Sequence, residues 1–151
     1  MSIYKSKAGK EAILSLYDKQ IKQLNREYKD LYIKTTFGNT HIIETGNMSG
    51  VPLLVFYGGN ATTAYNLLFC NFLMNDFHIF AVDTIGHPGK SDETSLSPNN
   101  YDYGKWVSEV INGLGYERIS CFGGSFGAGI IAKAMCVAPE KVKRAVLYVP
   151  S

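Results

Sequence analysis

The sequence lacks the features that mark secreted, membrane-spanning and metal-binding proteins. It contains only three cysteines, an odd number, and none has a spacing to histidine typical of a metal site. Cys121 lies in an apolar run and Cys136 in the helix-forming run after it, which favours buried, reduced thiols. No apolar run is long enough to cross a membrane, and the N-terminus has no apolar core typical of a signal peptide. We therefore expect a cytoplasmic protein with no metal and no membrane partner.

The charge is small as well, with 15 Lys and Arg against 13 Asp and Glu and a formal net charge of +2. The basic residues are scattered along the chain, so we expect no nucleic-acid partner. A hydrophobic content of 46% with 19% charged residues is ordinary for a globular protein. A chain of 151 residues is long enough to bury one core and normally forms one domain.

The most informative stretch that is present covers residues 119–131, where an apolar run ends in Gly123-Gly124-Ser125-Phe126-Gly127 and a helix-forming run follows. This is a G-x-S-x-G pattern between a predicted strand and a predicted helix, an arrangement that holds a serine hydroxyl on a strained turn. Glycines two residues before and after the serine let strand and helix approach closely. The helix start would offer free N–H groups to charge that develops beside the hydroxyl. A nucleophile with such an anion stabiliser is what acyl transfer requires.

Other interpretations of these glycines fit less well. A phosphate-binding P-loop needs Lys and then Ser or Thr after Gly129, where this chain has Ile130 and Ile131. A dinucleotide fingerprint over residues 127–132 would begin too far past the strand, and the next strand ends without an acidic residue for a ribose hydroxyl. A packing turn in which Ser125 only caps the helix stays open.

Hydrophobic periodicity divides the chain into alternating elements. Helical spacing predicts an amphipathic helix over about residues 7–28, and two extended runs around Gly38-Asn39 predict a hairpin. From residue 51 onward strands and helices alternate, which predicts an α/β fold with a mostly parallel sheet and helices on both faces. The predicted strands after the hairpin are 51–57, 77–82, 118–122 and 144–149, and the predicted helices are 62–74, 101–114 and 126–138. We divide the chain into an N-terminal helix, residues 1–30, and an α/β core, residues 31–151.

Three segments, in the right order, resemble motifs of the α/β-hydrolase superfamily. Val55-Phe56-Tyr57-Gly58-Gly59-Asn60 resembles its strand-to-loop segment, which usually reads His-Gly-x. The residues from Asp83 to Ser91 resemble its Asp-x-x-Gly-x-Gly-x-Ser turn, and Gly123 to Gly127 resembles its nucleophile elbow. The resemblance runs from about residue 31 to the end of the chain.

The chain departs from the family pattern at two places. Tyr57 stands where the family usually has a histidine of structural role, and one extra residue separates Gly86 from Gly89. A surface turn can absorb the extra residue, so neither departure changes the interpretation.

The resemblance implies a serine hydrolase that needs no cofactor and has Ser125 as its nucleophile. It also implies an oxyanion hole of two backbone N–H groups, one from Phe126 and one from Gly59, with Asn60 as a close alternative to Gly59. The expected activity is hydrolysis of an ester or related acyl bond in a small molecule, through an acyl-enzyme. The substrate stays open, since Tyr57, Tyr65 and Phe126 give only a hint of a small hydrophobic acyl group.

The resemblance also implies that a catalytic acid and histidine follow the serine in later strands. The sequence ends at Ser151, so we expect the N-terminal portion of a hydrolase, inactive by itself. Only His87 would lie on the active-site edge of the sheet; His78 would lie at the opposite edge, and the orientation of His41 is unknown. A structural role is favoured for His87 and for Asp83, which orders a turn in the family.

The sequence leaves two other functions open and also predicts self-association. The chain could be a non-catalytic binding module that keeps the scaffold without the chemistry, and its N-terminal helix could be an interaction arm, although core packing is favoured for that helix. The strand over residues 145–149 would be an exposed apolar edge, so we expect a homodimer or aggregates joined through it.

Overall fold

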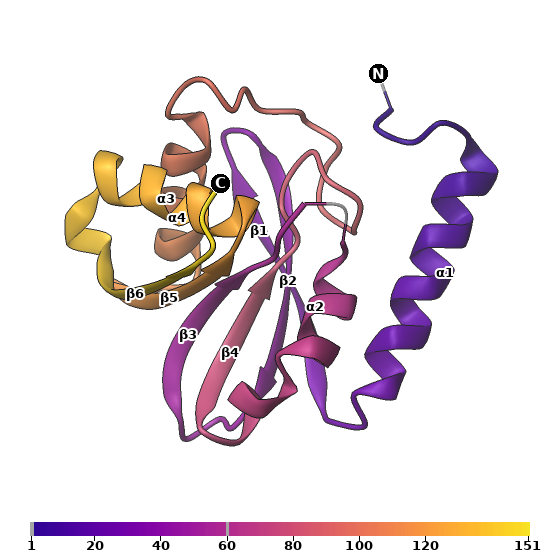
Figure 1. The fold of residues 1–151 in the computed structure, drawn as a ribbon, viewed down its shortest axis with the longest axis horizontal. Coiled ribbons are helices and arrows are strands. Elements are labelled where there is room, and N and C mark those ends of the chain that lie inside the picture. Colours follow the sequence, from indigo (N-terminus) through magenta and orange to yellow (C-terminus); the bar gives the residue numbers. More distant parts are fainter. Residues whose placement is uncertain (1, 60) are drawn as a thin grey trace.

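A mixed sheet of six strands forms the centre of the computed structural model, which describes residues 2–59 and 61–151 (Figure 1). The strand order is β1-β2-β4-β3-β5-β6. The strands are β1 (Tyr28–Thr35), β2 (Gly38–Gly46), β3 (Val51–Phe56), β4 (Phe77–Val82), β5 (Ile119–Gly124) and β6 (Val142–Tyr148). Strand β2 runs antiparallel to β1 and β4, whereas β3, β4, β5 and β6 are parallel to one another. The expected mostly parallel sheet with an antiparallel hairpin is therefore confirmed.

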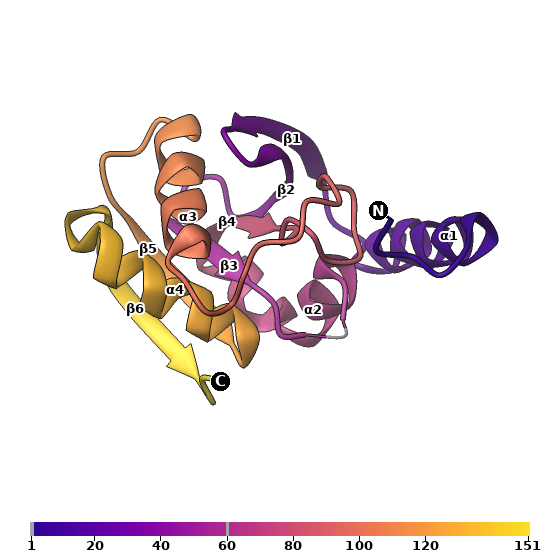
Figure 2. The same cartoon turned by 90° about the horizontal axis from the view of Figure 1, so that it is seen from above.

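Helices cover both faces of this sheet, as Figure 2 shows from above. The helices are α1 (Lys7–Gln23), α2 (Thr63–Phe69), α3 (Asp102–Gly113) and α4 (Phe126–Val137), with short 3-10 turns η1 (Asn71–Asn75) and η2 (Pro139–Lys141). Alternate residues of a strand point to opposite faces. In β3, Leu54 and Phe56 accordingly pack with α3 and α4, while Leu53 and Val55 pack with α1 and α2. Both faces are buried, which explains why this strand is a continuous apolar run.

Helix α1 is packed on the core through Tyr17 and Ile21, which are both almost fully buried. The division of the chain into residues 1–30 and 31–151 stays a prediction. The helix ends earlier than expected, at Gln23 instead of about residue 28. Asn25 adopts a left-handed backbone with φ of 50°, which stops the helix, and Tyr28 already belongs to β1.

The hairpin between β1 and β2 turns earlier than predicted, at Thr36 and Phe37 instead of Gly38-Asn39. Two contacts explain the difference. The Thr35 hydroxyl accepts the N–H of Phe37, and Glu109 of α3 accepts both the N–H and the hydroxyl of Thr36 at 2.6 Å. The second contact joins residues far apart in the sequence, so local turn preference could not reveal it.

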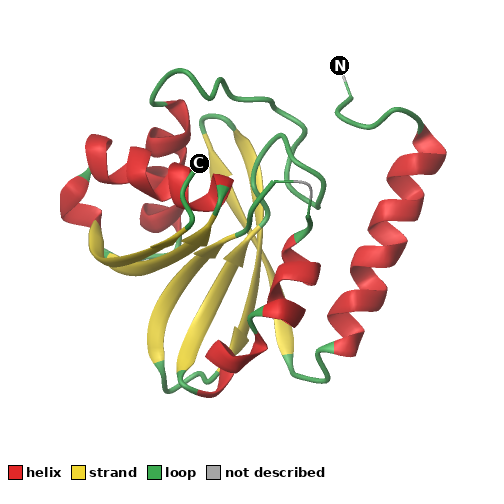
Figure 3. Cartoon of the chain, viewed as in Figure 1, coloured by secondary structure: helices red, strands yellow, loops and turns green. Residues whose placement is uncertain are grey.

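Loops at the carboxyl ends of β3, β4 and β5 gather at one edge of the sheet, the upper edge in Figure 3. This edge carries the three segments that the sequence analysis singled out. In the described ranges 2–59 and 61–151, no helix has the length and apolarity that a membrane crossing would need.

Candidate active site at the nucleophile elbow

Ser125 occupies a sharp turn between β5 and α4, with φ of 50° and ψ of −120°. A positive φ is uncommon for a residue with a Cβ atom and costs conformational energy. The turn is held from the neighbouring strand, because the N–H of Ser125 donates to the carbonyl of Tyr148 at 2.9 Å. Ser125 is the N-cap residue of α4, but its side chain makes no capping hydrogen bond. Ser125 is instead exposed at the carboxyl end of β5. The interpretation in which Ser125 serves only to cap the helix is therefore wrong.

The glycines around Ser125 are required by close contacts. A Cβ atom at Gly127 would lie 2.6 Å from the carbonyl oxygens of both Phe56 and Tyr57. A Cβ atom at Gly123 would lie 2.9 Å from the backbone carbonyl of Gly127. The missing side chain at Gly127 therefore lets the start of α4 meet the end of β3, and the one at Gly123 lets β5 meet α4.

The two segments that are expected to form the oxyanion hole both lie next to this serine. Phe126 is the first residue of α4, where backbone N–H groups have no partner within the helix. Gly58 approaches from the loop after β3, and a Cβ atom on it would lie 3.3 Å from the Cβ of Ser125. Gly59 follows it in an exposed position with open space around its Cα. Asn60, the alternative donor, lies outside the described residues.

None of the three histidines is hydrogen-bonded to Ser125 in the part of the chain that the structure describes. There the only side-chain partner of the Ser125 hydroxyl is the hydroxyl of Ser151, at 3.4 Å. His41 is buried beside Asp83, and His78 pairs with Glu44 at 2.7 Å near the other end of the sheet.

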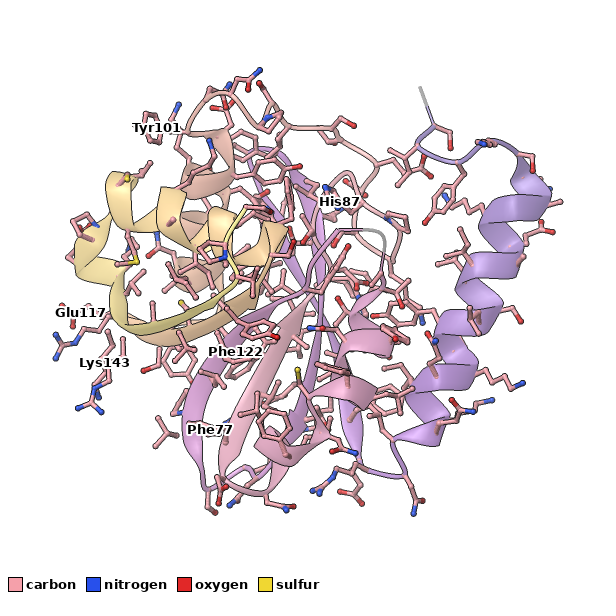
Figure 4. The ribbon with its side chains drawn as sticks, viewed as in Figure 1. Phe77, His87, Tyr101, Glu117, Phe122 and Lys143 are labelled. Carbon is pink, nitrogen blue, oxygen red and sulfur yellow. The ribbon has the colours of Figure 1, made fainter. Side chains whose placement is uncertain are left out.

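His87 is the histidine nearest to the elbow. Its ring stacks on Phe126 with centroids 4.8 Å apart, and its Nε2 lies 3.4 Å from the hydroxyl of Tyr103. Figure 4 shows His87 at the loop edge of the sheet, opposite the end that holds Phe77. Burial lowers the pKa of His87. These contacts agree with the structural role expected for it.

Asp83 is fully buried and organises the turn that follows β4. Its carboxylate accepts the hydroxyl of Tyr17 at 3.1 Å and the N–H of Lys90 at 2.8 Å, and it lies 2.7 Å from Nδ1 of His41. It is thus committed to holding the turn together, as the resemblance implied.

An open, mostly apolar groove of about 400 Å³ lies beside Ser125. Its lining includes Gly58, Asn66, Phe69, Phe72, Phe122 and Tyr148. Sequence reasoning did not single out these aromatic residues, because they come from α2, η1, β5 and β6 and only the sheet order brings them together. Of the three aromatics it did name, Tyr57 is buried and Tyr65 lines a different groove beside α1.

Among the residues that the structure describes, no group of three or more His, Cys, Asp and Glu side chains is arranged to hold an ion.

An α/β-hydrolase is defined by three features found here: a serine on a strand-turn-helix bend, a mostly parallel sheet, and loops gathered at the carboxyl edge of that sheet. Comparison with known protein families leads to the same class. The family model described as alpha/beta hydrolase fold matches residues 51–151. This chain belongs to that family.

Its relatives include carboxylesterases of Bacillus subtilis. The chain is 31% identical over 135 residues to carboxylesterase YbfK, covering 89% of this chain and 46% of that protein. The crystal structure of carboxylesterase CesB (YbfK) matches with a TM-score of 0.82 and 30% identity, over 91% of this chain and 48% of that chain. The crystal structure of naproxen esterase (carboxylesterase NP) matches with a TM-score of 0.80 and 27% identity, over 93% of this chain and 49% of that chain. The chain therefore spans about half the length of these relatives.

Proposed function

We propose that this chain carries the nucleophile of a serine carboxylesterase and that Ser125 is that nucleophile. The observation that carries the proposal is the backbone of Ser125, a serine with positive φ whose exposed hydroxyl caps nothing. Strain of this kind persists only where surrounding structure enforces it, and such strain gathers at functional sites. The kinship with carboxylesterases supports the ester as the bond that is cleaved.

In the proposed reaction, the Ser125 Oγ attacks the acyl carbon of the ester while a base accepts its proton. The carbonyl oxygen becomes an oxyanion that accepts hydrogen bonds from the backbone N–H groups of Phe126 and Gly59. The ester bond then breaks, the alcohol leaves with the proton, and water hydrolyses the acyl-enzyme on Ser125 by the same steps. Loss of one oxyanion donor typically lowers kcat by about 100- to 1000-fold. This chemistry needs no cofactor.

The base is the missing element of this mechanism. A serine hydroxyl is a weak nucleophile unless an adjacent base activates it. Within the described residues the histidines are engaged elsewhere, and the relatives are about twice as long as this chain. We therefore place the acid and the histidine in the half of such proteins that this chain does not span, and we expect the 151-residue chain alone to be inactive.

The groove beside Ser125 supports a small ester with a bulky apolar or aromatic group. Phe69, Phe72 and Tyr148 present exposed aromatic rings there, and aromatic linings favour flat apolar ligands. One relative is named naproxen esterase, and we extend the ester as the bond that is cleaved to this chain, with the apolar or aromatic group of the ester in the groove.

A non-catalytic binding module is the second candidate. The observation that favours it is the Ser125 hydroxyl itself, whose only side-chain partner in the described part of the chain is another serine. In this alternative the groove binds an apolar ligand without cleaving it.

A fluorophosphonate probe, which reacts with activated serines, separates the two candidates. The probe is applied to the 151-residue chain and to a chimera in which the C-terminal half of carboxylesterase YbfK follows Ser151. We expect labelling of the chimera, located at Ser125 by mass spectrometry and abolished by Ser125→Ala. The matched control is Ser151→Ala, which removes the neighbouring hydroxyl 3.4 Å away and should leave labelling intact. A folded chimera that stays unlabelled would support the binding module instead.

A further inference from the structure

The buried side chain of His41 lies between two carboxylates at a place that the proposed reaction does not use. Its Nδ1 is 2.7 Å from an oxygen of Asp83, and its Nε2 is 2.6 Å from an oxygen of Asp30. The side chains of His41 and Asp83 are fully buried, whereas that of Asp30 is 44% exposed. We call these three residues the charged cluster.

The hydrogen-bond partners around His41 favour one protonation state of its ring. Asp83 accepts hydrogen bonds from the Tyr17 hydroxyl and from the Lys90 N–H, so its carboxylate acts as an acceptor. Asp30 places a carboxylate oxygen on the other ring nitrogen, and its side chain is partly exposed to water. A neutral imidazole can donate from only one nitrogen, but two carboxylates on its two nitrogens require two donors. The arrangement therefore fits an imidazolium held between two anions.

The charged cluster is built into the turn that follows β4. The hydroxyl of Ser91 donates to the carbonyl of Asp83 at 2.6 Å, and Ser91 accepts the N–H of His41 at 2.8 Å. A Cβ atom at Gly89 would lie 2.8 Å from the carboxyl carbon of Asp83, so the turn is packed directly on that carboxylate.

The same turn touches both segments that flank Ser125. His87 stacks on Phe126, which follows the serine. The carbonyl of Pro88 accepts the hydroxyl of Tyr57 at 3.4 Å, and Tyr57 immediately precedes Gly58 and Gly59. The position of the turn thus bears on both of the N–H groups to which we assign the oxyanion.

We propose that the charged cluster positions the turn from Asp83 to Ser91 against the elbow, so that His41 is a positioning residue for the proposed ester hydrolysis and its loss of a proton loosens the site. This proposal rests on the proposed function in one respect, namely that the N–H groups of Phe126 and Gly59 bind the oxyanion. The charged cluster and the stacking of His87 on Phe126 stand on the geometry alone.

The pH range in which His41 loses its proton depends on the groups around it. Burial by itself lowers the pKa of His41, but the hydrogen bonds and charges of Asp83 and Asp30 outweigh it and raise that pKa above the ordinary 6.5. A group whose pKa is raised in the folded state contributes its full stabilisation at pH below its pKa in the unfolded chain. This stabilisation is lost as the pH rises through its pKa in the folded state. Loosening is therefore expected on the alkaline side of 6.5. The titratable groups that contact His41 are Asp83 of the turn, Asp30 and Tyr32 of β1, and Tyr17 of α1. Lys90 of the turn lies next to them, with its N–H on Asp83 and its ammonium group over the ring of Tyr17.

The test is an NMR titration of the 151-residue chain from mildly acidic to alkaline pH. It follows the ring signals of His41 and His87 and the backbone amide of Phe126. We expect the amide of Phe126 to report two transitions, one with His87 below 6.5 and one with His41 above 6.5, because the pKa of His87 is lowered by burial.

Two matched variants assign the upper transition. Asp30→Asn removes one anion from the imidazolium, so both the His41 midpoint and the upper Phe126 transition should move together to lower pH. Asp18→Asn is the control, because it removes a carboxylate of α1 that pairs with Lys90 and not with His41. It should leave the His41 midpoint and the upper Phe126 transition unchanged.

The proposal is overturned if His41 titrates at or below 6.5, or if the amide of Phe126 does not follow it. Neither signal depends on hydrolysis or on a probe at Ser125. Failure of this proposal and failure of the proposed function would therefore be seen in different experiments.

Discussion

At the residue scale, the glycines of the elbow differ in what they would strike if they carried a side chain. The Cβ of an alanine at position 127 would meet two backbone carbonyl oxygens at 2.6 Å, and backbone cannot move aside as a side chain can. The Cβ of an alanine at Gly124 would first meet the ring of Tyr148 at 3.7 Å, an ordinary contact.

We therefore expect Gly127→Ala to lower the free energy of unfolding by about 1–3 kcal/mol or more, through overpacking. Gly124→Ala, three residues away on the other side of Ser125, should change it by well under about 1 kcal/mol. Urea unfolding of the two variants and the parent chain measures the difference. Equal stability of the two variants would show that the spacing of the elbow does not depend on this steric contact.

The sharp turn at Ser125 could be predicted from the sequence because its requirement is local. A strained serine needs small neighbours at fixed offsets, and that pattern is visible without coordinates. The partners of His41 could not be predicted in the same way. They come from β1 and from the turn after β4, 11 and 42 residues away in sequence, and only the antiparallel register brings them to one ring.

At the element scale, helix α1 is attached to the turn after β4 by polar contacts as well as by packing. Lys10 and Glu93 form an ion pair, and so do Lys90 and Asp18 at 2.6 Å. The buried contact is the hydroxyl of Tyr17 on Asp83. Exposed ion pairs contribute little, so the buried hydroxyl is expected to matter most.

Tyr17→Phe removes only that hydroxyl and leaves the buried carboxylate with one donor fewer. We expect the free energy of unfolding to fall by about 1–3 kcal/mol, the usual cost of a lost partner to a buried charged group. The control is Tyr32→Phe, because the side chain of Tyr32 is 60% exposed and its loss of a hydroxyl should be nearly neutral. If both variants unfold at the same urea concentration, the Tyr17 hydroxyl does not anchor α1.

Element type could be predicted well, and element ends less well. The four strands from residue 51 onward were visible as apolar runs because the layers of helices bury both faces of the sheet. The predicted helix over residues 62–74 was wrong in one respect, since it divides at Cys70 into α2 and η1. Such ends are set by single backbone conformations and distant contacts, which periodicity does not record.

At the scale of the whole molecule, β6 is the outermost strand of the sheet at the end nearer to Ser125. It pairs with β5 on one side, and no strand of the described residues pairs with its other side. Val146 and Tyr148 are 59% and 63% exposed, and Tyr148 also lines the groove beside Ser125. A strand edge with unpaired backbone groups and apolar side chains is a template for another strand.

We propose that the occupant of this edge, for the 151-residue chain, is β6 of a second copy, and we expect a dimer in sedimentation velocity at tens of micromolar. Val146→Lys should shift the population to monomer, because a charged side chain on an edge strand opposes strand addition. Met48→Lys is the matched control, since Met48 is 53% exposed in the turn between β2 and β3 and the substitution adds the same charge away from β6. A monodisperse monomer for the parent chain, or equal dissociation by both lysines, would show that β6 does not join the copies.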